Sequence, residues 1–211
     1  MVYPIGKLII FPIYKLWLRR VDGIENVPRD RAFIMAVNHS SYYDSILIHS
    51  IIIPKIDKKI HALVNGIYWN YALPRYFLNL GECIPVYVGS NKNQKQNRNA
   101  MKKLLDYLKK GDIAMVFPEG TRSPDGKLQK AYTGIAKLAL ESKVSVLPCG
   151  IIGSNKVIPK GKILPGFARC DVKIGKPMTF ENKKYNQKSF EEITRKIMKE
   201  IAKLIGQKYD H

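Results

Sequence analysis

The sequence is poor in cysteine and in acidic side chains, and what it lacks narrows the class of protein. Three cysteines occur among 211 residues, and no two of them form a Cys-x-x-Cys pair, so a disulfide framework and a zinc site are both disfavoured. Asp and Glu total 17 against 36 Lys and Arg, which leaves a formal net charge of +19. This excess predicts an anionic partner, and charge alone does not separate nucleic acid from an anionic lipid surface.

The N-terminal segment is strongly apolar, yet its longest unbroken apolar stretch covers only residues 8–14. A bilayer-spanning helix needs ~20 such residues, and no cleavage pattern of a secretory signal follows. Aromatic residues alternate there with cations, in the order Tyr3, Lys7, Phe11, Tyr14, Lys15, Trp17, Arg19 and Arg20. Two interpretations remain open: a segment lying among the headgroups of an anionic membrane, and an amphipathic first helix packed on the domain.

The rest of the chain shows no sign of a second domain. It contains no internal repeat and no linker rich in Pro, Gly or Ser. We therefore expect an N-terminal amphipathic membrane-association segment over residues 1–20, followed by one domain over residues 21–211.

Short apolar runs rich in β-branched residues alternate with stretches of helical periodicity. The runs predict strands at residues 32–37, 60–64, 83–88, 113–117, 144–152 and 170–174. Helical spacing predicts helices around residues 45–53, 100–108, 135–140 and 190–204, and the polar stretch 89–99 predicts a surface loop. The alternation predicts an α/β fold with a mostly parallel central sheet flanked by helices.

A polar motif, Asn-His-Ser-Ser-Tyr-Tyr-Asp at residues 38–44, directly follows the first predicted strand. Open α/β sheets place reactive groups at such strand ends. If His39 lies just outside the next helix and Asp44 in its first turn, the carboxylate can hold the Nδ1 proton and leave Nε2 to accept a proton from a hydroxyl. Ser41 and Asp44 also have the spacing of a helix capping box, so spacing alone leaves a structural interpretation open.

A second polar motif, Phe-Pro-Glu-Gly-Thr-Arg-Ser at residues 117–123, ends another predicted strand. Glycine permits close backbone approach, and Arg122 offers a planar set of donors suited to a phosphate, with Glu119 near enough in sequence to orient it. The candidate substrate-binding residues are Glu119, Gly120, Thr121 and Arg122. Two plainer interpretations are an ion pair between Glu119 and Arg122 and an ordinary turn in the Ser-Pro-Asp-Gly that follows.

Together these motifs resemble the glycerophospholipid acyltransferase family, which carries a His-x4-Asp (HX4D) motif and includes the 1-acyl-sn-glycerol-3-phosphate acyltransferases. Further matching blocks are Gly-Ile-Glu-Asn-Val-Pro at residues 23–28, Lys-Leu-Ala-Leu at 137–140 and Val-Leu-Pro at 146–148. The resemblance covers roughly residues 20–180. The joint occurrence of these blocks is far more specific than either polar motif alone.

One block, around residues 81–86, departs from the family pattern. The family places Asp-Arg after this block, and Tyr-Val stands there instead, so the arginine that helps to hold the acceptor phosphate in the family is absent. Three downstream cations, Lys92, Lys95 and Arg98, can substitute for it. Otherwise the acceptor is a different lyso-lipid or polar lipid.

The resemblance implies an O-acyltransferase of phospholipid biosynthesis, peripheral or monotopic at the cytoplasmic face of an anionic membrane. His39 would act as general base and Asp44 would orient it, while the residues from Glu119 to Arg122 would shape the acceptor phosphate site. The implied co-substrate is acyl-CoA or acyl-ACP, the carrier-protein thioester, with no cofactor and no metal. The implied acceptor is a lyso-glycerophospholipid, foremost 1-acylglycerol-3-phosphate, which would give phosphatidate.

Two other classes of protein are compatible with parts of the sequence. A basic nucleic-acid-binding protein fits the charge, but the sequence contains no zinc-finger, helix-turn-helix or aromatic RNA-binding motif. An inactive lipid-binding relative would keep the fold, and the complete pair of His39 and Asp44 argues against it.

Overall fold

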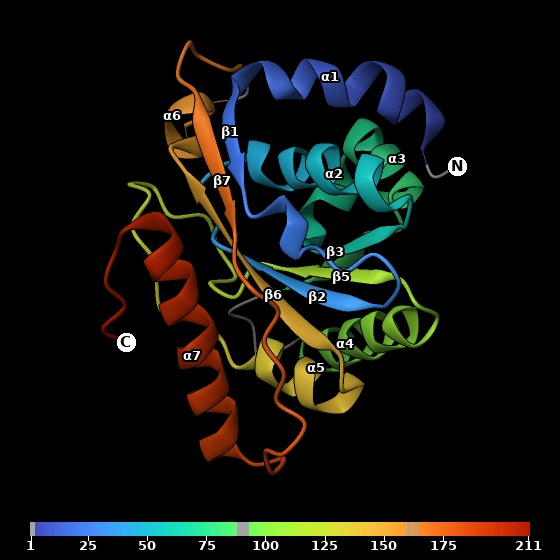
Figure 1. Cartoon of the computed structure of the whole chain (residues 1–211). Coiled ribbons are helices and arrows are strands. Elements are labelled where there is room, and N and C mark those ends of the chain that lie inside the picture. The colour runs from blue at the N-terminus through green and yellow to red at the C-terminus, as the bar shows by residue number, and fades with distance from the viewer. Residues whose placement is uncertain (1–2, 88–92, 160, 163) are drawn as a thin grey trace.

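A seven-stranded sheet with helices on both faces organises the chain (Figure 1). The computed structural model describes residues 3–87, 93–159, 161–162 and 164–211. Its strands are β1 (Leu18–Asp22), β2 (Phe33–Val37), β3 (Ile60–Asn65), β4 (Ile84–Val86), β5 (Ile113–Val116), β6 (Ser145–Ile152) and β7 (Cys170–Ile174). Its α-helices are α1 (Phe11–Tyr14), α2 (Tyr43–Ile56), α3 (Ala72–Leu80), α4 (Gln94–Lys109), α5 (Gly134–Ser142), α6 (Ser154–Val157) and α7 (Gln187–Ile205). Other helical turns are η1 (Gly6–Ile10), η2 (Lys15–Trp17), η3 (Ile24–Asn26) and η4 (Gly66–Asn70).

The strand order, β1-β7-β6-β2-β5-β3-β4, puts β2 at the centre of the sheet. The five strands from β6 to β4 run parallel, whereas β7 is antiparallel to β6 and parallel to β1. The prediction of a mostly parallel α/β sheet is confirmed, and all six predicted strands are present. Val88, the last residue of the predicted third strand, lies outside the described residues.

Each face of the sheet carries its own apolar core because side chains alternate along a strand. In β2, Phe33, Met35 and Val37 belong to one core, and Ile34 and Ala36 belong to the other. All five side chains are fully buried, as a central parallel strand requires. Figure 1 shows α1 and α2 on one side of the sheet and α4, α5 and α7 on the other.

The predicted loop over residues 89–99 is wrong in part, because α4 begins at Gln94. Residues 89–92 lie outside the described residues. Asn97, in the first turns of α4, accepts a hydrogen bond from the Tyr87 amide at 2.8 Å and donates to the Tyr87 carbonyl at 2.9 Å. The polar composition of this stretch reflects the exposed side of a helix tied to the end of β4.

The N-terminal segment packs on the domain with one side and exposes apolar residues on the other. Phe11 is buried, and the ring of Tyr14 stacks on Tyr43 of α2 at 6.0 Å between ring centres. Its exposed apolar side chains are Ile5, Leu8, Ile9, Ile13 and Leu16. β1 starts at Leu18 and pairs with β7, so a strand of the sheet spans the expected boundary at residue 20. Within the described ranges no helix combines the length and the apolar character needed to cross a bilayer.

Candidate active site

His39 and Asp44 form a hydrogen-bonded pair at the end of the central strand β2. His39 follows β2 outside any helix, and Asp44 occupies the first turn of α2, as the general-base hypothesis requires. His39 Nδ1 lies 2.8 Å from Asp44 Oδ2, with the imidazole 19% exposed and the carboxylate fully buried. An ionised carboxylate only accepts hydrogen bonds, so Nδ1 carries the proton and Nε2 is the basic nitrogen of the neutral ring.

The Asp44 carboxylate also organises the turn that precedes α2. Its Oδ2 accepts hydrogen bonds from the amides of Ser40 at 2.7 Å and Ser41 at 2.8 Å. The Ser41 hydroxyl in turn accepts from the amide of Tyr43 at 3.2 Å. The structural and the catalytic interpretations of this motif are therefore compatible, because one buried carboxylate both builds the turn and orients the His39 ring.

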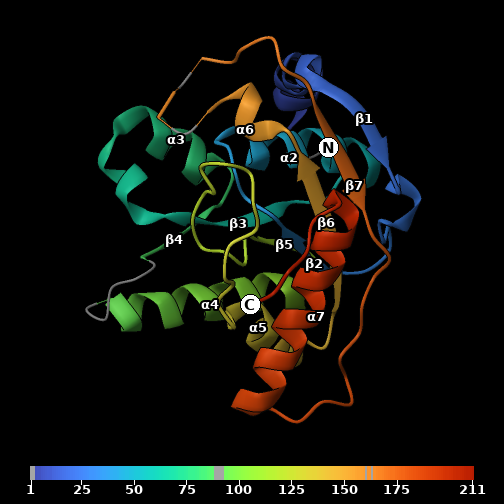
Figure 2. The same ribbon diagram turned by 90° about the vertical axis from the view of Figure 1, so that its left-hand side faces the viewer.

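Glu119 joins the second motif to the first through the main chain of His39. β2 and β5 are parallel neighbours, so their carboxyl ends meet at one edge of the sheet, which faces the viewer in Figure 2 with the loop between β5 and α5 in front. Glu119 accepts hydrogen bonds from the amides of His39 at 2.9 Å and Gln129 at 2.8 Å. The Ser123 amide donates to the His39 carbonyl at 2.8 Å. The second motif thus holds both main-chain polar groups of His39.

The Glu119 side chain lies beneath the surface. It is 2% exposed, and burial raises its pKa to about 7, although the two amide hydrogen bonds act in the opposite direction. The nearby charge of Asp44 adds to the rise in the pKa. This geometry gives Glu119 a positioning role for His39, whereas the sequence hypothesis placed it in the substrate site.

We expect Glu119 to lower the stability of the protein as the pH rises. The unfolded chain releases this proton near the ordinary pKa of 4.5, whereas the folded protein holds it to about 7. The contribution of protonated Glu119 to the free energy of unfolding is therefore complete below pH ~4.5 and is lost as the pH rises to ~7. The difference in pKa corresponds to roughly 3 kcal/mol. Urea unfolding across this pH window should show a steeper loss for the wild type than for Glu119→Gln, and equal slopes would contradict the assignment.

Arg122 and Tyr42 bring the two motifs together a second time, nearer the surface. The guanidinium carbon of Arg122 lies 3.5 Å from the centre of the Tyr42 ring, and the Tyr68 hydroxyl donates to the Tyr42 hydroxyl at 3.1 Å. Tyr68 belongs to η4, which follows β3, the other neighbour of β5. Stacking engages the face of a guanidinium and phosphate binding uses its edge, so the two are compatible.

Gly120 and Thr121 make the turn that separates Glu119 from Arg122. Gly120 has a φ of +67°, a left-handed conformation that favours glycine, and its amide donates to the Phe117 carbonyl at 3.0 Å. Thr121 is exposed, and Gly120 and Arg122 are half-buried. Three of the four predicted binding residues therefore reach the surface, and the fourth, Glu119, supports them from below.

Phe117 and Asn38 take part in the site, although their residue types predict no role there. The Phe117 ring stacks on the His39 imidazole, with ring centres 3.9 Å apart. Asn38 connects β2 to β6, because its side chain donates to the Ile151 carbonyl at 3.0 Å and accepts from the Ile151 amide at 2.7 Å. The one feature of the sequence that could have indicated their roles is their position, since each directly follows a strand whose end forms the site.

The arrangement defines an α/β protein with a histidine–carboxylate pair at the carboxyl ends of its parallel strands. His39 can take up a proton at Nε2 and share the resulting charge with Asp44. Burial raises the pKa of the thiols of Cys83 to about 11 and Cys170 to about 12, which keeps both protonated and poorly nucleophilic at neutral pH.

The chain belongs to the family described as Acyltransferase, whose model matches residues 19–152. It is 26% identical over 157 residues to the chloroplastic 1-acyl-sn-glycerol-3-phosphate acyltransferase LPAT1 of Arabidopsis thaliana, covering 74% of this chain and 41% of that protein. It is 27% identical over 145 residues to the 1-acyl-sn-glycerol-3-phosphate acyltransferase of Bacillus subtilis, covering 68% of this chain and 69% of that protein. The resemblance to the glycerophospholipid acyltransferase family is confirmed.

A solved structure supports the same fold. PlsC, the 1-acyl-sn-glycerophosphate (LPA) acyltransferase of Thermotoga maritima, superposes with a TM-score of 0.68 over 92% of this chain and 80% of that chain, at 22% identity. At this identity the likeness concerns the fold alone. The chain spans about two fifths of the length of the plant relatives that it matches.

Proposed function

We propose that the chain is an O-acyltransferase that moves a fatty acyl group from acyl-CoA or acyl-ACP to the hydroxyl of a lyso-glycerophospholipid. 1-Acylglycerol-3-phosphate is the leading acceptor, and phosphatidate is its product. The observation that carries the proposal is the 2.8 Å contact between His39 Nδ1 and Asp44 Oδ2, which makes Nε2 the basic nitrogen of an oriented ring. The family and the names of the relatives support the reaction and the acceptor.

In the proposed mechanism, His39 Nε2 accepts the proton of the acceptor hydroxyl as its oxygen attacks the thioester carbonyl carbon. Asp44 stabilises the imidazolium through the Nδ1 hydrogen bond. Collapse of the tetrahedral intermediate breaks the carbon–sulfur bond, and the imidazolium returns its proton to the leaving thiolate. The sequence of steps uses no acyl-enzyme, no bound cofactor and no metal.

We assign the acceptor phosphate to Arg122, with Gly120 and Thr121 shaping the turn beside it. Lys95 and Arg98 project from the first turns of α4, which follows β4, three strands away from β2. At roughly 4.8 Å per strand, the distance from β2 to β4 across the sheet is about 14 Å. Lys95 and Arg98 would therefore bind the acceptor phosphate only if it lay toward β4. Arg122 stacks on Tyr42, which lies between His39 and Asp44 in the sequence. Arg122 is therefore the phosphate-binding cation that lies beside the catalytic pair. Lys92 lies outside the described residues.

The reaction is tested with purified protein in liposomes supplied with oleoyl-CoA. Free thiol and lipid product are measured with lysophosphatidate, glycerol 3-phosphate and neutral lyso-lipids as acceptors. We expect transfer to lysophosphatidate. Transfer to neutral lyso-lipids alone would reassign the acceptor, and no thiol release with either CoA or carrier-protein thioesters would overturn the enzymatic proposal.

Apolar side chains exposed on the N-terminal segment and on α3 support docking on an anionic membrane, which we place at the cytoplasmic face. Leu8 of η1 is 78% exposed and Leu16 of η2 is 63% exposed. α3 contributes further exposed side chains at Leu73, Tyr76, Phe77 and Leu80. Clusters of large exposed apolar residues commonly mark interaction surfaces, and a net charge of +19 attracts anionic headgroups.

Leu8→Ser combined with Leu16→Ser should weaken binding to phosphatidylglycerol-containing vesicles by at least about tenfold, because each fully inserted side chain contributes roughly 1.5–3 kcal/mol. Cosedimentation at fixed salt concentration measures the effect. A control, Tyr132→Ser with Tyr185→Ser, removes two exposed aromatic side chains from loops outside the N-terminal segment. Equal losses in the two double variants would argue against docking through the N-terminal segment.

A further inference from the structure

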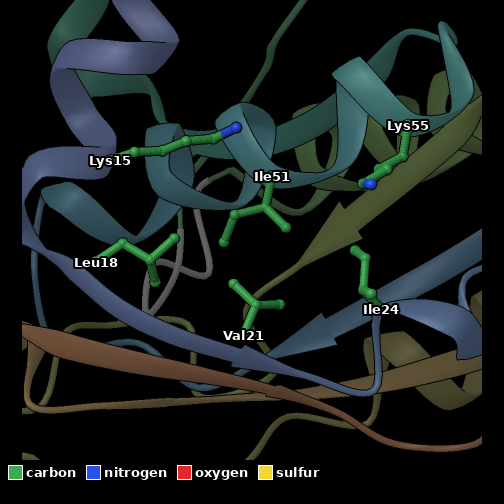
Figure 3. Close-up of a pocket in the computed structure, with 6 residues that line it drawn as sticks. All are labelled: Lys15, Leu18, Val21, Ile24, Ile51 and Lys55. Atoms are coloured by element: carbon green, nitrogen blue, oxygen red, sulfur yellow. The ribbon is translucent and has the colours of Figure 1, made fainter.

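A pocket of about 210 Å³ opens between the N-terminal segment and α2, away from the catalytic pair. Leu18, Val21, Ile24 and Ile51 form its apolar lining, and Lys15 and Lys55 complete it. Figure 3 shows the two lysine side chains with the four apolar side chains gathered between and below them. We call this cavity the Lys15–Lys55 pocket.

Among the described residues, no carboxylate neutralises the two lysines of this pocket. In the parts of the chain that the structure describes, neither Lys15 nor Lys55 forms an ion pair. The acid closest to Lys55 along the chain, Asp57, pairs with Lys7. Burial lowers the pKa of Lys15, and the positive charge of Lys55 lowers it further. An anion between the two ammonium groups would relieve this repulsion.

The size and lining of the pocket select the class of anion. Its volume of about 210 Å³ exceeds the ~150 Å³ of an apolar cavity that holds benzene, enough for a phosphate and the first carbons of a chain. The apolar lining is unsuited to a free inorganic ion, and the two lysines are unsuited to a neutral lipid. Ile13 and Leu16, which lie within two residues of Lys15 in the sequence, are 49% and 63% exposed. The pocket thus adjoins the segment proposed to lie on the membrane.

We propose that the Lys15–Lys55 pocket binds one anionic phospholipid of the membrane that is not consumed in the reaction. Its phosphate lies between the two ammonium groups, and the beginning of its acyl chains covers the apolar lining. Asp44 and Lys55 lie eleven residues apart on α2, about 16 Å along the helix axis. Neither His39 nor Asp44 lines the pocket, so the bound lipid lies outside the catalytic pair and fixes the N-terminal segment against α2. This inference rests on the proposed membrane association and not on acyl transfer.

The test uses dihexanoyl phosphatidylglycerol below its critical micelle concentration, titrated calorimetrically into the whole chain. The wild type should bind one lipid saturably, and Lys15→Gln with Lys55→Gln should weaken binding by about tenfold or more. The matched control, Lys199→Gln with Lys203→Gln, removes the same charge from the exposed side of α7 and should bind like the wild type. His39→Ala should also bind like the wild type, because the pocket is separate from the catalytic pair.

Three results would overturn the pocket: unchanged binding in the Lys15 and Lys55 variant, equal weakening in the control pair, or equally tight binding of inorganic phosphate. Unchanged binding would show that the two lysines do not hold the lipid. Equal weakening in the control pair would indicate general charge attraction. Equally tight binding of inorganic phosphate would show that the apolar lining contributes nothing. Thiol release from oleoyl-CoA, measured on the same proteins, separates this proposal from the enzymatic one. Saturable lipid binding without any thiol release would support the pocket while acyl transfer fails.

Discussion

His39→Ala should lower the rate of acyl transfer by about 10²–10⁴-fold while the protein remains folded. The substitution removes Nε2, the proposed base, together with the ring that stacks on Phe117. The hydrogen bonds that His39 forms with Glu119 and Ser123 use the main-chain amide and carbonyl of His39, which alanine retains. The substitution should therefore lower the rate of the chemical step and leave the main-chain conformation around residue 39 unchanged.

Thiol release and lipid product give the rate, and urea unfolding gives the stability. His49→Ala is a matched control, because His49 is a second imidazole on α2 whose ring nitrogens lie 2.7 Å from the Ser45 carbonyl and 3.3 Å from the Ile60 carbonyl. It should lower stability and leave the rate nearly unchanged. A His39→Ala protein that transfers acyl groups at the wild-type rate would remove His39 from the mechanism.

Asp44→Asn should lower the rate by about 10-fold to 10³-fold with a modest loss of stability. The amide oxygen can take the place of Oδ2, which accepts from His39, Ser40 and Ser41, so the turn is kept. The amide nitrogen can take the place of Oδ1, which is buried and forms no hydrogen bond within the described structure. What disappears is the negative charge that supports the imidazolium in the transition state.

Asp44→Ala separates the two roles of this carboxylate. It removes the charge and also leaves the buried amides of Ser40 and Ser41 without their acceptor, at roughly 1–3 kcal/mol for each amide. Urea unfolding should therefore rank the wild type and Asp44→Asn close together and Asp44→Ala well below them. If Asp44→Asn were as unstable as Asp44→Ala but still fully active, the carboxylate would be structural only.

Much of the sheet was predictable because buried parallel strands leave a local pattern. The five apolar residues of β2 are such a run, and the polar motif behind them marks the end of the strand. β1 escaped prediction, since Arg19 and Arg20 interrupt its apolar pattern. These arginines are tolerated at the edge of the sheet, where Arg19 Nε donates to Asp171 of β7 at 2.8 Å. Asp171 is distant from Arg19 in the sequence, so the local residue pattern does not predict the strand.

The sequence by itself determined which groups can do chemistry: an imidazole and a carboxylate at helix-start spacing in His39 and Asp44, and a guanidinium after a second strand in Arg122. These follow from local spacing and side-chain type. Only the tertiary structure decided that Glu119 holds the His39 main chain and that Lys15 shares a pocket with Lys55. Both contacts join segments far apart along the chain, and the order of the strands and the packing of the N-terminal segment on α2 bring them together.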